Sequence, residues 1–136
     1  MIFREAAEKD YPAIIEFHKS QNWGLDTLSA VKNFHHLNSI IVCEIDGKIV
    51  GKIDLMQKSK QSRSYLYFER LIVHPDFRHK GIAKKFLEYA EQECKKRNLD
   101  TLELSVREDN IPAKQLYDSH GFQVLGKKIY MQKVIK

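Results

Sequence analysis

The chain has 136 residues, the length of a single domain, and it combines 43% hydrophobic with 30% charged residues, as globular proteins do. No apolar run approaches the roughly 20 residues that span a bilayer, and the N-terminus lacks the apolar core of a signal peptide. The formal net charge of +5 is compatible with a nucleic acid, an anionic membrane surface or a polyphosphate ligand. We expect one domain over residues 1–136, with no membrane partner.

The two cysteines, Cys43 and Cys94, are too few for a disulfide framework. Cys43 lies in a strand-like run, and Cys94 lies on the apolar face of a predicted helix. Both are therefore expected to be small buried hydrophobic side chains in a reducing compartment, which makes the cytoplasm the expected location.

The first part of the chain predicts a strand, two helices and a β-hairpin. The signals are, in order, a strand from Ile2, a helix capped by Asp10, a break at Asn22–Gly24, a second helix capped by Asp26 or Thr27, and strands over 40–45 and 48–56 joined by Asp46-Gly47. An Asp-Gly pair between two β-branched runs is typical of a two-residue hairpin turn.

The second part predicts further strands and two helices. The signals are a polar loop over 58–64, a strand over 65–73, a helix over 80–97, a strand around Leu102–Val106, a helix opened by Asn110 and stopped by Gly121, and two strands over 122–125 and 129–134. This order predicts a mixed α/β fold, with one sheet of about seven strands, about four helices and a parallel crossover around the helix over 80–97.

The stretch Leu71–Leu87 indicates an anion site. An apolar strand runs through a turn into a helix whose apolar positions recur every three or four residues. The first N–H groups of a helix have no internal partner and carry partial positive charge. Gly81 would let a ligand approach the backbone closely. Four basic side chains add charge: Arg78, Lys80, Lys84 and Lys85. We therefore expect a phosphate or pyrophosphate site, the alternative being that the basic turn and its glycine are only a bend before the helix.

Two motifs at a fixed separation resemble the GCN5-related N-acetyltransferase (GNAT) superfamily. Arg78-x-x-Gly81-x-Ala83 is similar to its acyl-CoA pyrophosphate turn, with Ala83 in place of a second glycine. Asn110-x-x-Ala113-x-x-Leu116-Tyr117-x-x-x-Gly121-Phe122 is similar to its second signature. The resemblance covers the whole chain and the order of its elements, and it implies the GNAT acyl-CoA N-acyltransferase fold.

The resemblance implies how acetyl-CoA would bind. The backbone of Leu71, Ile72 and Val73 would bind the pantetheine arm, and Asn110 would bind its far end. The strand containing Leu104 would splay away from the strand containing Val73 to leave room for it. The pyrophosphate would lie on Arg78 and on the turn that follows it: His79, Lys80, Gly81, Ile82, Ala83 and Lys84.

Direct transfer to an amine requires a base for the amine and an acid for the leaving thiolate. Tyr117, which would lie near the sulfur, is the expected acid, although it could also only complete an apolar helix face. Glu69 is the expected base, on one strand face with Tyr67 and Leu71 if that strand has no bulge. The alternatives are that Glu69 is a surface carboxylate paired with Arg70, or that the base is Glu103.

The resemblance therefore implies an N-acetyltransferase that moves the acetyl group of acetyl-CoA to a primary amine of a small molecule, peptide or protein. The alternative is a non-catalytic acyl-CoA-binding or regulatory module. Trp23 would form a wall for the acceptor, unless it only packs on the sheet. Lys127 and Lys128, in the loop expected near the acceptor, disfavour a strongly cationic amine. The sequence predicts no metal site and no nucleic-acid partner, and a monomer or homodimer.

Overall fold

A computed structural model describes residues 1–136, which divide into two compact units. The first unit, Met1–Ser105, contains β1 Ile2–Glu5, the 3-10 turn η1 Glu8–Asp10, α1 Tyr11–Gln21, α2 Leu28–Leu37, β2 Ser39–Ile45, β3 Lys48–Lys60, β4 Arg63–Val73, the 3-10 turn η2 Pro75–Phe77, α3 Ile82–Lys96 and β5 Leu102–Glu103. The second unit, Val106–Lys136, contains α4 Ile111–Ser119. The mixed α/β class and the four helices are confirmed.

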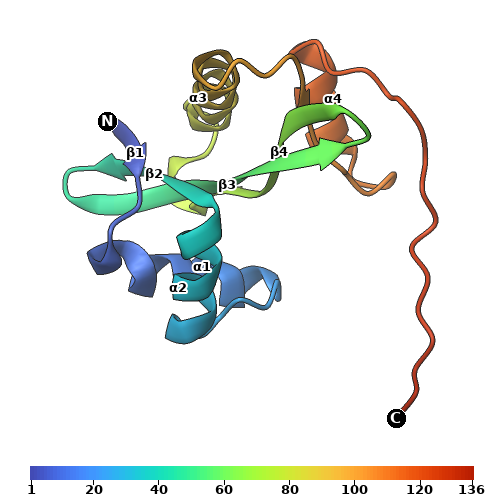
Figure 1. The fold of residues 1–136 in the computed structure, drawn as a ribbon. Helices are drawn as coiled ribbons and strands as arrows, with labels where there is room; N and C mark the ends of the chain where they lie inside the picture. Colours follow the sequence, from blue (N-terminus) through green and yellow to red (C-terminus); the bar gives the residue numbers. More distant parts are fainter. The chain divides into compact units, whose positions relative to one another are not determined.

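The first unit is built on a five-stranded sheet in the order β1-β2-β3-β4-β5. Every neighbouring pair is antiparallel except β4 and β5, which run parallel and are connected along the chain through α3. The predicted parallel crossover is therefore confirmed. Figure 1 shows α1 and α2 on one face of this sheet and α3 on the other.

Each face of the sheet has its own apolar packing. The face toward α1 and α2 carries a buried cluster of Ala6, Tyr11, Ile14, Val31, Ile40 and Val42. On the other face, α3 approaches β3 at Gly51. A Cβ atom on Gly51 would lie 2.8 Å from the carbonyl oxygen of Ile72 and 3.0 Å from the Phe86 ring. Only glycine therefore fits there without a shift of the strand or the ring.

The apolar face of α3 follows the predicted spacing. Its buried members are Ile82, Phe86, Leu87, Ala90 and Cys94, whereas Ala83 is only half-buried. Cys43 is also buried, and both cysteines are free thiols. The expectation that the cysteines act as small hydrophobic side chains is confirmed, since burial also raises the pKa of each thiol.

The first hairpin has the predicted turn, whereas the second does not. Asp46 and Gly47 have positive φ angles of 50° and 77°, as a two-residue turn of this type requires. The predicted polar loop over 58–64 is wrong, because β3 continues to Lys60 and β4 begins at Arg63. Polarity indicated a loop there, but both strands of an antiparallel ribbon can be exposed to solvent.

The caps of the first two helices differ from each other. Thr27 caps α2 by accepting a hydrogen bond from the Ala30 N–H at 3.2 Å, which decides between the two residues proposed for that cap. Asp10 precedes α1 without a side-chain capping bond. Its carboxylate instead accepts the Ala7 N–H at 2.8 Å and pairs with Arg4 at 2.7 Å. The prediction that the Asp10 side chain caps α1 is therefore wrong, although the helix starts where expected.

A bulge in β4 lies opposite β3 between Lys52 and Asp54. Glu69 pairs with Asp54, and the residue after Leu71 pairs with Lys52, so two residues of β4 oppose one of β3. Arg70, the first residue of the bulge, has a φ of 52°. An extra residue interrupts the alternation of a strand. Glu69 therefore lies on the face that Asp54 shares, and the alternation expected through Leu71 is broken.

The two C-terminal strands predicted over 122–125 and 129–134 are absent. Residues 122–136 have no regular secondary structure and are almost entirely exposed. Figure 1 draws the chain after α4 without an arrow. A strand needs a neighbour to pair its backbone groups, and the second unit contains no other strand. The alternation of apolar residues is real, but alternation alone does not supply a partner strand.

Two charged side chains of β3 are fully buried beside the apolar cluster. Lys52 and Asp54 are both 0% exposed and, two residues apart, they share a strand face. Lys52 Nζ lies 2.6 Å from Asp54 Oδ1 and 2.9 Å from His18 Nε2. The contact with Asp54 is an ion pair whose angles do not meet those of a hydrogen bond. Arg70 Nε donates to Asp54 Oδ2 at 2.6 Å. The buried carboxylate thus has a cation on each oxygen.

Burial changes the protonation of this network. It lowers the pKa of Lys52 to about 8, although Asp54 attracts the ammonium. Burial, and then the charge of Lys52, lower the pKa of His18. Neutral His18 can accept from Lys52 through Nε2 while Nδ1 donates to the Leu25 carbonyl at 2.8 Å. His18 therefore links the network to the segment between α1 and α2.

The shifted pKa of Lys52 predicts a pH dependence of stability. Between the folded value of about 8 and the unfolded value of 10.5, the unfolded chain binds more protons, so the free energy of unfolding rises with pH. This term is at most about 3 kcal/mol. We expect Lys52→Met to remove it. Urea unfolding of both proteins, from about pH 7.5 to about pH 10, measures the difference.

Comparing the wild type with Lys52→Met separates the contribution of Lys52 to the pH dependence from that of other titrating groups. The raised thiol pKa values of Cys43 and Cys94 act in the opposite direction as pH rises, but they are common to both proteins. If the two stability curves stay parallel over this pH range, the ammonium of Lys52 is not the cause.

Candidate acetyl-CoA and catalytic site

The turn before α3 presents unpaired backbone N–H groups. His79 and Gly81 have positive φ angles of 63° and 78°, and these bend the chain into the helix. The Lys85 N–H donates to the Gly81 carbonyl at 3.1 Å and forms the first bond of α3. The amides just before Lys85 therefore have no partner within the helix. This is the local geometry that anions occupy at helix N-termini.

Basic side chains surround this turn. Arg78 Nε donates to the Val73 carbonyl at 3.0 Å and fixes the turn to the end of β4. The ammonium groups of Lys48 and Lys80 lie 5.6 Å and 5.4 Å from the centre of the Phe77 ring. Lys48 comes from the first hairpin, so two segments supply positive charge. Together with the free amides, this charge suits a pyrophosphate.

The edge of β4 leading to this turn is open in the first unit. Its pairing with β5 is limited to Leu66 with Leu102 and Tyr67 with Glu103. β5 ends at Glu103, so Leu104 is not part of a strand. The last residues of β4, up to Val73, have no strand partner on that side. An unpaired strand edge can bind an extended ligand through its backbone.

Glu69 lies at the bulge of β4, immediately before this open edge. Its side chain is 36% exposed, and its Oε1 lies 2.8 Å from Nη1 of Arg70. The ion pair that was the alternative for Glu69 is therefore present. This ion pair uses Oε1 of the carboxylate and not Oε2.

Glu103, the other base candidate, has a different environment. Its Oε2 accepts from Arg63 at 3.0 Å and from Thr101 Oγ1 at 3.2 Å. Arg63 and Thr101 are also bonded to each other at 2.6 Å. This three-residue contact ties the start of β4 to β5. These contacts hold the Glu103 side chain next to the parallel strand pair.

Trp23 is half-buried and packs against the buried polar network. Its ring meets the His18 ring edge-on at 5.9 Å, and Lys52 Nζ lies 5.9 Å from its ring centre. The segment around it has positive φ angles at Asn22, Gly24 and Leu25. Trp23 is thus connected, through Lys52, to the side of the sheet that carries Glu69.

The second unit contains the other two predicted site residues. Asn110 Oδ1 caps α4 by accepting the Ala113 N–H at 3.3 Å, which leaves its Nδ2 group to donate elsewhere. Tyr117 is half-buried on α4, and its ring meets the Phe122 ring edge-on at 5.7 Å. Burial raises the pKa of the Tyr117 hydroxyl, so it keeps its proton at neutral pH.

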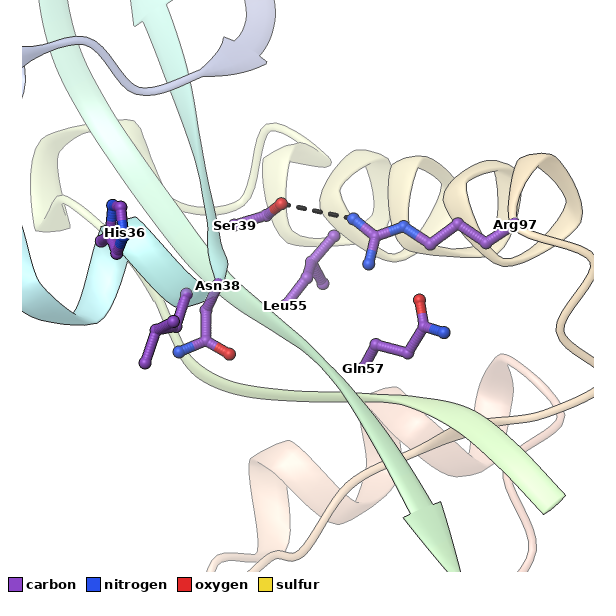
Figure 2. A pocket seen from close by; sticks show the side chains of 7 residues that line it. His36, Asn38, Ser39, Leu55, Gln57 and Arg97 are labelled. Atoms are coloured by element: carbon purple, nitrogen blue, oxygen red, sulfur yellow. Dashed lines mark hydrogen bonds between the residues drawn. The ribbon is translucent and has the colours of Figure 1, made fainter. Parts of the chain in front are cut away.

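A polar hollow of about 340 Å³ lies elsewhere in the first unit. Its lining comes from the end of α2, the start of β2, β3 and the end of α3. Figure 2 shows Arg97 reaching from α3 toward Ser39, which accepts its hydrogen bond at 3.3 Å, with Gln57 nearby. None of the predicted site residues lines this hollow.

Two further properties of the chain concern metals and membranes. No three His, Cys, Asp or Glu side chains come together in a way that could hold a metal ion. None of the helices combines the length and the apolar character needed to cross a bilayer.

Sequence reasoning missed the buried residues behind Glu69, which are Lys52, Asp54 and His18. A signal was present. Lys52-Ile53-Asp54 puts opposite charges two apart in a run that otherwise reads as a buried strand, and charged residues are rarely buried unless they are paired. His18 is buried on α1 together with Tyr11 and Ile14, but its residue type does not indicate its contact with Lys52.

The chain is similar to known proteins over most of its length. Residues 3–122 match the sequence model of the Acetyltransferase (GNAT) family. The chain is 25% identical over 138 residues to the L-amino acid N-acetyltransferase AaaT of Escherichia coli (strain K12), covering 93% of this chain and 85% of that protein.

Solved structures show the same fold. A predicted acetyltransferase with acetyl-CoA from Clostridium acetobutylicum superposes with a TM-score of 0.79 and 19% identity, covering 96% of this chain and 95% of that one. The aminoglycoside antibiotic 6'-N-acetyltransferase AAC(6')-IG from Acinetobacter haemolyticus has a TM-score of 0.79 and 21% identity, with 100% of each chain covered.

The family match includes both motifs on which the resemblance rested, the turn from Arg78 to Ala83 and the segment from Asn110 to Phe122. The GNAT fold and the use of acetyl-CoA as acetyl donor are confirmed. The chain belongs to the acetyltransferase (GNAT) family and is an acetyl-CoA-dependent N-acetyltransferase.

Proposed function

We propose that Glu69 and Tyr117 are the base and the acid of a direct acetyl transfer. The neutral amine attacks the thioester carbonyl carbon, the C–S bond breaks, and the acetyl group forms an amide. The proton of the amine leaves to Glu69, directly or through water, and the thiolate takes the Tyr117 hydroxyl proton. The observation that carries this proposal is the partly exposed Glu69 carboxylate at the bulge beside the open edge of β4.

We propose that the cofactor follows β4 into α3. The backbone of Leu71, Ile72 and Val73 would bind the pantetheine arm, and Asn110 would bind its far end. The pyrophosphate would bind at Arg78 and the following residues of the turn: His79, Lys80, Gly81, Ile82, Ala83 and Lys84. The unpaired amides before Lys85 and the ammonium groups around Phe77 support this assignment.

We propose that the acceptor is the primary amine of a small molecule, with L-amino acids as the first class to examine. The relative named for that activity covers 93% of this chain. The structures named for aminoglycosides are less than 25% identical and indicate the fold alone. Trp23, next to the network behind Glu69, would form the apolar wall of the acceptor site.

Three broader proposals accompany this function. Residues 1–136 would work as one domain, since the family match runs through both units. The chain would act in the cytoplasm as a monomer or homodimer. Its free, buried cysteines support the cytoplasmic location. It would act without a nucleic acid, because the phosphates of acetyl-CoA would account for the basic turn.

A thiol-release assay with acetyl-CoA identifies the acceptor class. The panel contains L-amino acids, polyamines, aminoglycosides and short peptides with a free N-terminus. We expect the highest kcat/KM among the L-amino acids. A preference of about tenfold or more for any other class would contradict the acceptor proposal.

Glu69→Gln tests the base with the acceptor that this panel selects. The amide keeps the shape of the carboxylate but does not accept the proton, so we expect kcat to fall by about 100-fold or more. The decrease of rate toward acid pH should also disappear from the kcat profile. A variant with wild-type kcat and the wild-type pH profile would remove Glu69 from the mechanism.

Tyr117→Phe tests the acid. Only the hydroxyl is lost, and the ring that meets Phe122 remains. We expect kcat to fall by about 100-fold because the thiolate leaves without a proton, while the Kd of CoA changes by less than about threefold. Stopped-flow thiol release and calorimetric CoA binding give the two values. Unchanged turnover would exclude Tyr117 as the acid.

A further inference from the structure

A continuous chain of charged side chains runs inward from Glu69. Glu69 Oε1 lies 2.8 Å from Arg70 Nη1, and Arg70 Nε lies 2.6 Å from Asp54 Oδ2. Asp54 Oδ1 lies 2.6 Å from Lys52 Nζ, which reaches His18 Nε2 at 2.9 Å. Arg70 therefore bridges two carboxylates through two different nitrogens, one carboxylate buried and one partly exposed.

Burial increases along this chain of contacts. The side chain of Glu69 is 36% exposed and that of Arg70 is 17% exposed, whereas the side chains of Asp54 and Lys52 are fully buried. Only the Glu69 end reaches solvent to a substantial degree. A buried carboxylate with two cations is held in one position, because either oxygen would lose a charged partner if the side chain turned.

Arg70 has an unusual backbone and a tightly held side chain. Its φ of 52° is in the left-handed region at the bulge, which is uncommon for a residue other than glycine. Its guanidinium lies 5.0 Å from the centre of the Phe34 ring of α2. Asp54 and Phe34 thus fix the guanidinium, and a planar guanidinium fixed in this way sets the direction in which Glu69 is bound.

We propose that Asp54 is a positioning residue for acetyl transfer, because through Arg70 it holds the carboxylate of Glu69 in place for the incoming amine. This inference rests on the proposed role of Glu69 as base. Asp54 is fully buried, so it offers no surface to an acceptor or a cofactor. Lys52 pairs with Oδ1 of Asp54, so Oδ2 stays directed at Arg70.

A double-mutant cycle with Glu69 tests the proposal. We expect Asp54→Asn to lower kcat by about 10- to 100-fold, with the KM for acetyl-CoA within about twofold of wild type. In the Glu69→Gln background, the same change should lower kcat no further, since the base it positions is already gone. A residue that only supports the fold would lower activity by the same factor in both backgrounds.

Asp54→Asn leaves Lys52 with a weakened partner in the core, and such changes can prevent folding. Arg70→Lys is the second variant. It keeps a cation beside Asp54, but one ammonium does not reproduce the two-nitrogen bridge. We expect the same loss of kcat and the same absence of a further loss in the Glu69→Gln background.

Arg97→Lys is the matched control. Arg97 also bridges two partners, with Nε on Glu93 at 3.1 Å and Nη2 on Ser39 at 3.3 Å, but it lies at the far end of α3 from the pyrophosphate turn. Figure 2 shows its position in the polar hollow. We expect its kcat to stay within about twofold of wild type.

The outcomes separate the two proposals. If Glu69→Gln has wild-type turnover, the base assignment fails and Asp54 has no base to position. If Glu69→Gln is slow and Arg70→Lys reduces its rate again by the full single-variant factor, the base stands and the positioning role is overturned. Wild-type turnover of Arg70→Lys in the native background also overturns it. Non-additive loss in the cycle supports both proposals.

Discussion

The bulge at Arg70 is the constraint on which the arrangement of the site depends. Before it, β4 directs Glu69 toward the face of the sheet covered by α1 and α2. After it, the same strand continues along its open edge to Val73 and the turn into α3. Without the extra residue, the alternation of the strand would put either Glu69 or the segment after it on the wrong face. One local irregularity thus places a candidate base beside the proposed cofactor-binding edge.

The bulge is held by ionic contacts whose burial costs free energy. Taking Lys52 and Asp54 out of water costs several kcal/mol per ion, and apolar residues of similar volume would often be as stable or more so. Lys52 has a pKa lowered to about 8, which records the cost of keeping its charge in the core. Neighbouring positions on the same face, Val42 and Ile40, are apolar. The charged pair is therefore better explained by what it positions than by its contribution to stability.

The sequence predicted most of the first unit because its signals are local. Asp46-Gly47 set the first hairpin, Thr27 capped α2, and the spacing of Ile82, Phe86 and Leu87 predicted the buried face of α3. The strands expected after Phe122 were not found, because a strand depends on a partner that alternation does not specify. The presence of a bulge in β4 was left open by the sequence, since it depends on pairing between β3 and β4 rather than on any one residue.

The proposed cofactor site can be predicted from the sequence further than the proposed acceptor site can, and the reason is the kind of contact that each would use. The proposed cofactor site uses backbone amides at a helix N-terminus and a strand edge, so a short motif such as Arg78-x-x-Gly81-x-Ala83 is enough to indicate it.

The proposed acceptor site depends on the segment around Trp23, whose shape comes from tertiary contacts. Leu25 has a φ of 48°, and its carbonyl accepts from His18, which is itself held by Lys52. A left-handed leucine is not indicated by its own residue type, since such a conformation disfavours most side chains. The same buried network that reaches Glu69 at one end therefore shapes the segment around Trp23 at the other. A change in the core between them would alter the proposed base, Glu69, and the proposed acceptor wall, Trp23, together.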